Sequence, residues 1–533
     1  MASGPAPVKP AGAVPRHPAR AAVRTLTAQG WPARIAAFAV TAAILGPLAA
    51  VIRHAGGLSG LGPGDIDALW FTLWQAAVSA VLSCLLAVPV ARALARRRFP
   101  GRGLLISLMG APFILPTVVA AMGLVAVFGR RGMVNAGLEA IGLPGITIYG
   151  AQGVILAHVF LNLPLAVRMV LHGWQAVPSE RLRLAAALGF GRAEVARHIE
   201  RPMLRAVLPG AFLAIFLVCL TSFAIALTLG GGPRATTVEL AIYQAFRFDA
   251  DAGRAAALAL VQIGVSVVAL LASLALTAPP AFGAGLDRAD APPVRGARIK
   301  DGLVLGAATL FLLLPLATIL LRGLPALFDL PPSILRAAGT SVAIALGSTG
   351  LTLALALPLA LAAPRARWAE VAGTLPMTAS SLVLGTGLFL ILRPFVNPVT
   401  LALPVTLLAN ALMSLPFALR LLMPEARALR ADYDRLAASL GLRGLARLRL
   451  LDLPRLARPL GFSAGLAAAF SMGDLGVITL FSDGQRQTLP LALYQLMGAY
   501  RMDLAAAAAC LLMALTFALF WAFDRIGQNA DPR

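Results

Sequence analysis

The chain of 533 residues contains 59% hydrophobic and only 13% charged residues, and its mean hydropathy is +0.83. These proportions exclude an ordinary soluble protein, in which roughly 25% of the residues are charged. The formal net charge of +22 could suit a nucleic-acid-binding protein, so the positions of the charges must decide between the two classes.

Apolar segments dominate the chain after residue 33. Residues 1–33, rich in Pro, Ala and Arg, lack apolar periodicity and predict a disordered cytoplasmic tail. Twelve apolar runs follow, each long enough to cross about 30 Å of hydrocarbon, and runs rich in Ala and Leu satisfy their backbone groups there as helices. The sequence therefore predicts an all-α polytopic membrane protein with spans at 34–53, 68–93, 103–129, 146–172, 208–229, 254–278, 302–322, 336–363, 370–393, 399–424, 460–482 and 500–523.

The charges are distributed unevenly between the connections. With the N-terminus inside, 34 of the 45 Lys and Arg residues fall on the inner side and 11 outside. An excess of cations in cytoplasmic loops is the usual signature of membrane topology. The pattern predicts that both termini are cytoplasmic, including a short tail at 524–533, and it explains the net charge without a nucleic-acid partner.

A repeated sequence divides the chain into two halves. RLAAALG from Arg183 recurs as RLAASLG from Arg435, and the same offset of 252 maps Pro164 onto Pro416. Because each half holds an even number of spans, the halves have the same orientation and form a parallel repeat of two six-helix units. We expect the halves at 34–278 and 302–523, joined by a cytoplasmic linker at 279–301 that is rich in proline and charge.

Each half also contains one long inner connection, at 173–207 and at 425–459. Each connection predicts a short helix, a glycine turn and a second short helix, which Pro202 or Pro454 is expected to stop. We call these connections the first and second elbows. One amphipathic elbow could simply lie on anionic lipid, whereas two copies in register favour paired docking sites for another protein.

The spacing in the elbows resembles the EAA loop of ABC importer permeases, which inserts into a groove of the ATPase subunit. The family's usual glutamate is Arg in both copies and the alanine after it is Leu, which leaves open any salt bridge of that glutamate. The resemblance implies that the ATPase-coupling residues are Arg183, Ala185, Gly189, Ile199 and Pro202 in the first elbow and Arg435, Ala437, Gly441, Leu451 and Pro454 in the second.

The resemblance extends over nearly all of the chain beyond the tail. LTLGGGPRATTVELAIYQAFRFD from Leu227 and SMGDLGVITLF from Ser471 resemble the thiamine and thiamine pyrophosphate permeases of bacterial ABC importers. This implies a bacterial inner-membrane permease that works with two copies of a separate ATPase and one periplasmic substrate-binding protein. A ferric-iron permease of the same fused form is one alternative, and an ion-coupled secondary transporter is the alternative from another class.

Enzyme chemistry has no candidate residues in the sequence. Lys9 and Lys300 are the two lysines, and neither ends a glycine-rich P-loop, so the ATP and Mg²⁺ are expected to be used by the partner subunit. No cluster of His, Cys and acidic residues has metal-ligand spacing, so we expect no metal, cofactor or catalytic residue in this chain. The three cysteines lie in apolar runs and are expected to be packing residues.

Asp474 is the one acid in the body of a predicted span. An ionised carboxylate there costs several kcal/mol unless it faces water or a partner. One hypothesis is that Asp474 lines the substrate path and receives the thiazolium cation. The alternatives are that it caps a helix break near Gly473 and Gly476, or pairs with an arginine. Its counterpart in the first half is expected to be apolar, near Ile225.

Ser222 and Ser471 are interpreted as matching positions in the fifth and eleventh spans, and Asn162 and Ser414 as matching positions in the fourth and tenth. They could line the path, but hydrogen bonding between helices is the commoner use of such residues in membranes.

The outer segments Thr237–Gln244 and Thr488–Gln495 contain a Tyr–Gln pair in each half. The resemblance implies a periplasmic gate, close to the substrate receptor, at Tyr243, Gln244, Tyr494 and Gln495. Anchoring of the tyrosine rings at the membrane interface is the alternative.

Overall fold

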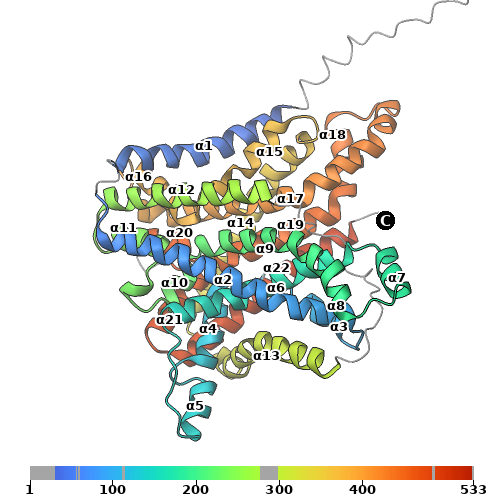
Figure 1. Ribbon diagram of the computed structural model, residues 1–533. Coiled ribbons are helices and arrows are strands. Elements are labelled where there is room, and N and C mark those ends of the chain that lie inside the picture. The colour runs from blue at the N-terminus through green and yellow to red at the C-terminus, as the bar shows by residue number, and fades with distance from the viewer. Residues whose placement is uncertain are drawn as a thin grey trace, which may run out of the picture.

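The computed structural model describes residues 30–55, 57, 60–110, 114–276, 298–482 and 486–530 (Figure 1). Within these ranges the regular structure is helical throughout, with no strand. Eleven of the helices described are long and apolar enough to cross a membrane, and a bent pair raises the number to twelve. The prediction of an all-α polytopic protein is confirmed. The predicted tail and linker lie almost wholly outside the described residues.

The two halves contain corresponding sets of helices. The first half contains α1 (Trp31–His54), α2 (Pro63–Arg96), α3 (Arg102–Leu108), α4 (Thr117–Phe128), α5 (Met133–Ala140), α6 (Ala151–Gln175), α7 (Ser179–Ala187), α8 (Arg192–Val195), η3 (Ala196–Glu200), α9 (Arg201–Leu220), α10 (Phe223–Leu229), η4 (Pro233–Ala235), α11 (Val238–Arg247) and α12 (Ala252–Leu276). The second half contains α13 (Arg298–Gly323), η5 (Pro325–Asp329), α14 (Pro332–Ala362), α15 (Arg367–Thr374), η6 (Leu375–Thr378), α16 (Ser381–Leu392), η7 (Pro398–Leu401), α17 (Ala402–Ser439), α18 (Gly444–Arg447), η8 (Leu448–Asp452), α19 (Leu453–Gly473), α20 (Gly476–Phe481), α21 (Leu489–Gly498) and α22 (Met502–Asn529).

Corresponding hydrogen bonds show how the halves match. The Val238 N–H at the start of α11 donates to Thr72 Oγ1 on α2 at 2.8 Å. The Leu489 N–H at the start of α21 donates to Ser341 Oγ on α14, also at 2.8 Å. α2 therefore corresponds to α14 and α11 to α21.

Four of the predicted spans are broken in the structure, two of them before the short helices α4 and α16. The span expected at 103–129 is divided into α3 and α4, and the span at 370–393 bends by 91° between η6 and α16. Pro116 precedes α4 and Pro376 lies in η6, and proline lacks the N–H that a continuous helix needs. The prediction of continuous helices was wrong, and α4 and α16 are half-length helices that begin within the protein.

The transition from membrane to elbow differs between the halves. In the first half α6 ends at Gln175, Pro178 interrupts the chain, and α7 begins at Ser179. In the second half Arg430 takes the place of that proline, and α17 continues without a break to Ser439. A separate first helix in the second elbow was predicted wrongly, because Pro424 is accommodated within α17.

The first helix of each half packs against the other half. α1 contacts α14, α15 and α16, while α13 contacts α2 and α4. Two glycines permit the close approach. A Cβ atom on Gly387 would lie 2.4 Å from the Pro47 carbonyl oxygen, and one on Gly123 would lie 2.9 Å from that of Pro315. The two halves are therefore interlocked through their opening helices.

This close packing predicts that Gly387→Ala destabilises the protein. The added methyl group would overlap the backbone of α1, and overpacking of this kind costs about 1–3 kcal/mol. Gly350→Ala is the matched control, because a Cβ atom on that helical glycine meets no atom within 4 Å. Thermal unfolding in detergent should show a lower Tm for Gly387→Ala alone. Equal Tm values for the two variants would contradict the interlocked arrangement.

Candidate coupling and translocation sites

Each elbow turns at a glycine in the left-handed conformation. Gly189 has φ +70° and Gly441 has φ +66°, and a Cβ atom on either would meet open space. The backbone conformation, and not crowding, therefore requires glycine at both positions.

The same hydrogen bond closes both turns. The Phe190 N–H donates to the Ala185 carbonyl oxygen at 2.9 Å, and the Leu442 N–H donates to that of Ala437, also at 2.9 Å. This six-residue closure with a left-handed glycine is a Schellman motif, which ends a helix. Ala185 and Ala437 are both buried, at 5% and 2% exposure. The two predicted glycine turns thus have the same local structure.

The elbows expose large apolar side chains at matching positions. In the first elbow Leu184 is 60% and Leu188 is 62% exposed, and in the second elbow Leu436 is 52% and Leu440 is 65% exposed. We call Leu184 with Leu188, and Leu436 with Leu440, the elbow patches. They lie at the end of the bundle that carries α7, α8, α18 and the C-terminus (Figure 1). Exposed apolar patches on elements beyond a membrane bundle are typical of protein docking surfaces.

The remaining coupling candidates lie at or after a π-helical turn. Ile199 in η3 and Leu451 in η8 are half-buried. Pro202 and Pro454 follow the π turns directly, in the first turns of α9 and α19, and the residues before them have helical backbone angles. The prediction that these prolines stop a helix was wrong, since each elbow continues directly into a membrane helix.

A buried acid anchors each π turn, and the sequence analysis missed both. Glu200 is 5% exposed and pairs with Arg92 at 3.0 Å and with Arg96, both on α2. Asp452 is 6% exposed and pairs with Arg447 at 3.3 Å. The offset of 252 relates the two acids, and that repeat was the signal that could have identified them. Glu200 therefore ties the first elbow to α2, whereas Asp452 holds together two turns within the second elbow.

The helices that follow the elbows end at two breaks, about 30 Å from the elbows. α9 ends at Leu220 before α10, and α19 ends at Gly473 before α20. Asp474 is the C-cap of α19, and the Gly476 N–H donates to its Oδ1 atom at 3.2 Å. Its Oδ2 atom is buried without a hydrogen-bond partner among the described residues. Asp474 therefore does lie at a helix break, with one oxygen left unpaired.

The structure corrects the predicted pairing of residues at the breaks. The offset of 252 relates Ser222, the N-cap of α10, to Asp474, and it relates Cys219 to Ser471. The pairing of Ser222 with Ser471 was therefore wrong by three positions. The expectation of an apolar counterpart near Ile225 was also wrong, because the polar residues Thr221 and Ser222 form the first-half break.

Ser471 and Cys219 each accept a hydrogen bond from an asparagine of a neighbouring helix, although the two asparagines lie one helical turn apart in the repeat. Asn410 Nδ2 on α17 donates to Ser471 Oγ at 2.9 Å, and Asn162 Nδ2 on α6 donates to Cys219 Sγ at 3.5 Å. Ser471 is thus engaged between helices, and Ser222 is half-buried at the start of α10.

Glu239 is a second buried acid, and its sequence position alone did not reveal its burial. It lies in the first turn of α11, is 1% exposed, and forms no ion pair with a described residue. Ser380 of the second half is its hydrogen-bond partner. Asp474 also lies close to this turn, because both approach the same point beside Gly476. A Cβ atom placed on Gly476 would be 2.7 Å from Ser381 Oγ and 3.5 Å from Asp474 Oδ1. Glu239 and Asp474 therefore flank the turn at Ser380 and Ser381.

The predicted gate residues lie on α11 and α21. Tyr243 and Tyr494 are half-buried and lie near each other across the two halves. Gln244 is half-buried and Gln495 is exposed. The role of these four residues as a gate stays a prediction.

Aromatic rings join the halves next to these tyrosines. Phe246 on α11 meets Phe389 on α16 edge to face with ring centroids 4.6 Å apart, and Phe389 meets Phe481 on α20 at 5.6 Å. In the described ranges no group of three His, Cys, Asp or Glu residues could hold a metal ion. The two halves thus meet at these aromatic rings, and the elbows with their exposed leucines lie at one end of the bundle.

Comparison with known proteins defines the class of this fold. Residues 86–278 match the family of the binding-protein-dependent transport system inner membrane component. The chain is therefore a multi-pass permease subunit of the inner membrane.

Relatives along the whole chain narrow the class. The chain is 40% identical over 505 residues to the thiamine transport system permease protein ThiP of Brucella abortus (strain 2308), an alignment that covers 91% of this chain and 93% of the relative. It is 39% identical over 476 residues to the protein of that name from Escherichia coli (strain K12), covering 86% and 89%. The Haemophilus influenzae protein is 35% identical over 481 residues, covering 86% and 88%. The chain belongs to the family of thiamine transport system permease proteins.

Proposed function

We propose that this chain is the permease subunit of an importer that carries thiamine or its phosphates into the cytoplasm, driven by ATP that a separate subunit hydrolyses. The observation that carries the proposal is the pair of matched elbows with exposed leucines at one end of the bundle. The relatives that align with most of the chain are named thiamine transport system permease proteins, and these names support thiamine as the substrate.

Each elbow patch docks one copy of the ATPase, so the complex contains two copies. The elbow end and both termini face the cytoplasm, as the excess of Lys and Arg on that side supports. The opposite end, with Tyr243 and Tyr494, faces one periplasmic substrate-binding protein. ATP and Mg²⁺ are bound by the ATPase, and the permease itself binds no cofactor.

Movement of the elbows is transmitted through α9 and α19 to the two helix breaks. α9 has 20 residues, which at 1.5 Å per residue span about 30 Å, and it joins the first elbow directly to the break at Thr221. α19 joins the second elbow to Asp474 in the same way. Closure of the ATPase pair would move both helices as rigid bodies and open the path to the other side.

The central carboxylates suit a cationic substrate. A buried carboxylate without a cationic partner is costly, and the cost is removed when a cation binds. Glu239 of the first half and Asp474 of the second would receive the thiazolium ring and the amino group of thiamine. The site is asymmetric, because Pro490 takes the place of Glu239 in the other half.

Reconstitution tests the function. Proteoliposomes that contain the permease, its ATPase and its binding protein should take up labelled thiamine only when ATP and the binding protein are both present. Omission of either should reduce uptake at least tenfold. Uptake driven by an ion gradient without ATP would support a secondary transporter instead, and uptake of ferric iron in place of thiamine would overturn the substrate assignment.

A further inference from the structure

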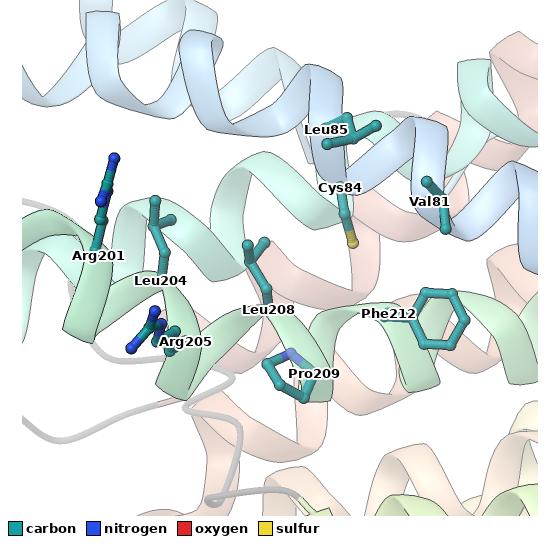
Figure 2. Close-up of a pocket in the computed structure, with 9 residues that line it drawn as sticks. All are labelled: Val81, Cys84, Leu85, Arg201, Leu204, Arg205, Leu208, Pro209 and Phe212. Atoms are coloured by element: carbon teal, nitrogen blue, oxygen red, sulfur yellow. The ribbon is translucent and has the colours of Figure 1, made fainter.

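A groove of about 510 Å³ runs along the outside of the first half between α2 and α9 (Figure 2). Its volume is within the range of about 300–1,000 Å³ that small-molecule sites have. Val81 and Leu85 on its α2 side are 44% and 63% exposed, as expected of residues that face lipid. The apolar part of its lining is formed mainly by Val81, Cys84, Leu85, Leu204, Leu208 and Phe212.

Two arginines provide the charge in the groove. Arg201 and Arg205 stand at one end, and Val81 and Phe212 at the other (Figure 2). Both arginines are exposed, and neither forms an ion pair with a described acidic residue. Glu200, the nearest acid in sequence, is already held by two arginines of α2. This end of the groove therefore carries two uncompensated positive charges.

The length of the groove matches one leaflet of a bilayer. Arg201 and Phe212 are eleven residues apart on one continuous helix, which corresponds to about 16 Å. Half of a hydrocarbon core of about 30 Å is about 15 Å. The arginines thus lie at the level of the lipid headgroups, on the elbow side, and the apolar lining extends to the bilayer centre.

We propose that this groove binds one anionic phospholipid from the leaflet on the elbow side. The single phosphate group of the lipid pairs with Arg201 and Arg205, and an acyl chain lies along the leucines of α9. Basic pockets between membrane helices recognise anionic headgroups in this way. The lipid would contact the base of the first elbow, and it is separate from the substrate path.

The second half does not repeat the charged end of the groove. At the offset of 252, Leu453 replaces Arg201 and Ala457 replaces Arg205. Ala457 is 9% exposed, so this position presents neither charge nor much surface. The internal repeat therefore predicts one lipid per chain and not two.

Lipid titration tests the proposal on the full chain. The purified permease is titrated with dioleoylphosphatidylglycerol or with dioleoylphosphatidylcholine, and bound lipid is counted by native mass spectrometry. One tightly bound phosphatidylglycerol per chain is expected. Each arginine near the headgroups contributes about 1 kcal/mol, so R201Q with R205Q should weaken binding about 30-fold.

Two further variants make the result specific. R458Q with R525Q removes two exposed arginines of the second half and should leave phosphatidylglycerol binding unchanged. Leu208→Trp keeps both groove arginines but fills the apolar part, and it should also weaken binding at least tenfold. Unchanged binding in either groove variant, or phosphatidylcholine bound as tightly as phosphatidylglycerol, would overturn the proposal.

Discussion

Replacement of both elbow glycines by proline should leave the permease in the membrane and detach its ATPase. Proline fixes φ near −65°, whereas Gly189 and Gly441 require φ +70° and φ +66°. The turn that orients the exposed leucines of each elbow patch would therefore be lost. We expect co-purification of the ATPase to fall at least tenfold and ATP-dependent uptake to fall to background.

The double variant Gly189→Ala with Gly441→Ala should have a smaller effect in the same direction. A left-handed conformation costs an L-residue about 1–2 kcal/mol, which the fold can absorb without losing the turn. This graded series separates a change of backbone conformation from a general disturbance of the elbow.

Gly142→Pro is the matched control for the elbow experiment. Gly142 has φ +74° and open space around its Cα atom, but it lies at the other end of the bundle beyond α5. This variant should keep the complex intact. A full complex that co-purifies with both elbow prolines present would overturn the docking role of the elbows.

The second large effect is expected at the central carboxylates. Asp474→Asn and Glu239→Gln keep the size of each side chain but remove the charge that would meet the substrate. Hydrogen bonds to charged groups contribute about 1.5–3 kcal/mol, so each variant should weaken thiamine uptake by about 10- to 100-fold. Uptake is measured at matched expression, with Asp67→Asn at the exposed end of α2 as the control.

A neutral analogue separates substrate binding from a purely structural role. In an analogue whose thiazolium nitrogen is replaced by carbon, the ring has the same shape but no charge. The wild type should prefer thiamine strongly, and Asp474→Asn should lose most of that preference. If Asp474→Asn transports both compounds poorly but still prefers thiamine, Asp474 has a structural role only. If thiamine uptake is unchanged in both Asp474→Asn and Glu239→Gln, neither acid binds the substrate.

The sequence predicted the helical class and the repeat, because hydrophobic length and the offset of 252 are local signals. It did not predict the breaks before α4 and α16, since those spans are apolar on both sides of the break. The offset is 252 from α6 to α10 and 251 in α11, whereas Thr72 and Ser341 are 269 positions apart. Because the loops differ in length, the sequence did not reveal which earlier helices correspond. It also did not reveal that α1 and α13 each pack against the other half.

The candidate sites were predicted unevenly for a similar reason. The elbow glycines could be found because a left-handed turn restricts the residue type to glycine. Glu239 could not, because its burial depends on α16 of the other half, which the local sequence does not reveal. The position of Ser222 was assigned three residues away from its true partner, because apolar spans give few landmarks for alignment.

The interlocking of α1 and α13 determines which parts of the molecule can move as units. Gly387 holds α1 against α16, and Gly123 holds α13 against α4. If the two halves rotate against each other during transport, each opening helix must move together with the helices that it contacts. Each opening helix is shared between the halves, because α1 contacts α12 of its own half as well as α14, α15 and α16, and α13 contacts α22 as well as α2 and α4. Since these shared contacts must be kept during transport, we expect the halves to pivot about the two opening helices and not to separate.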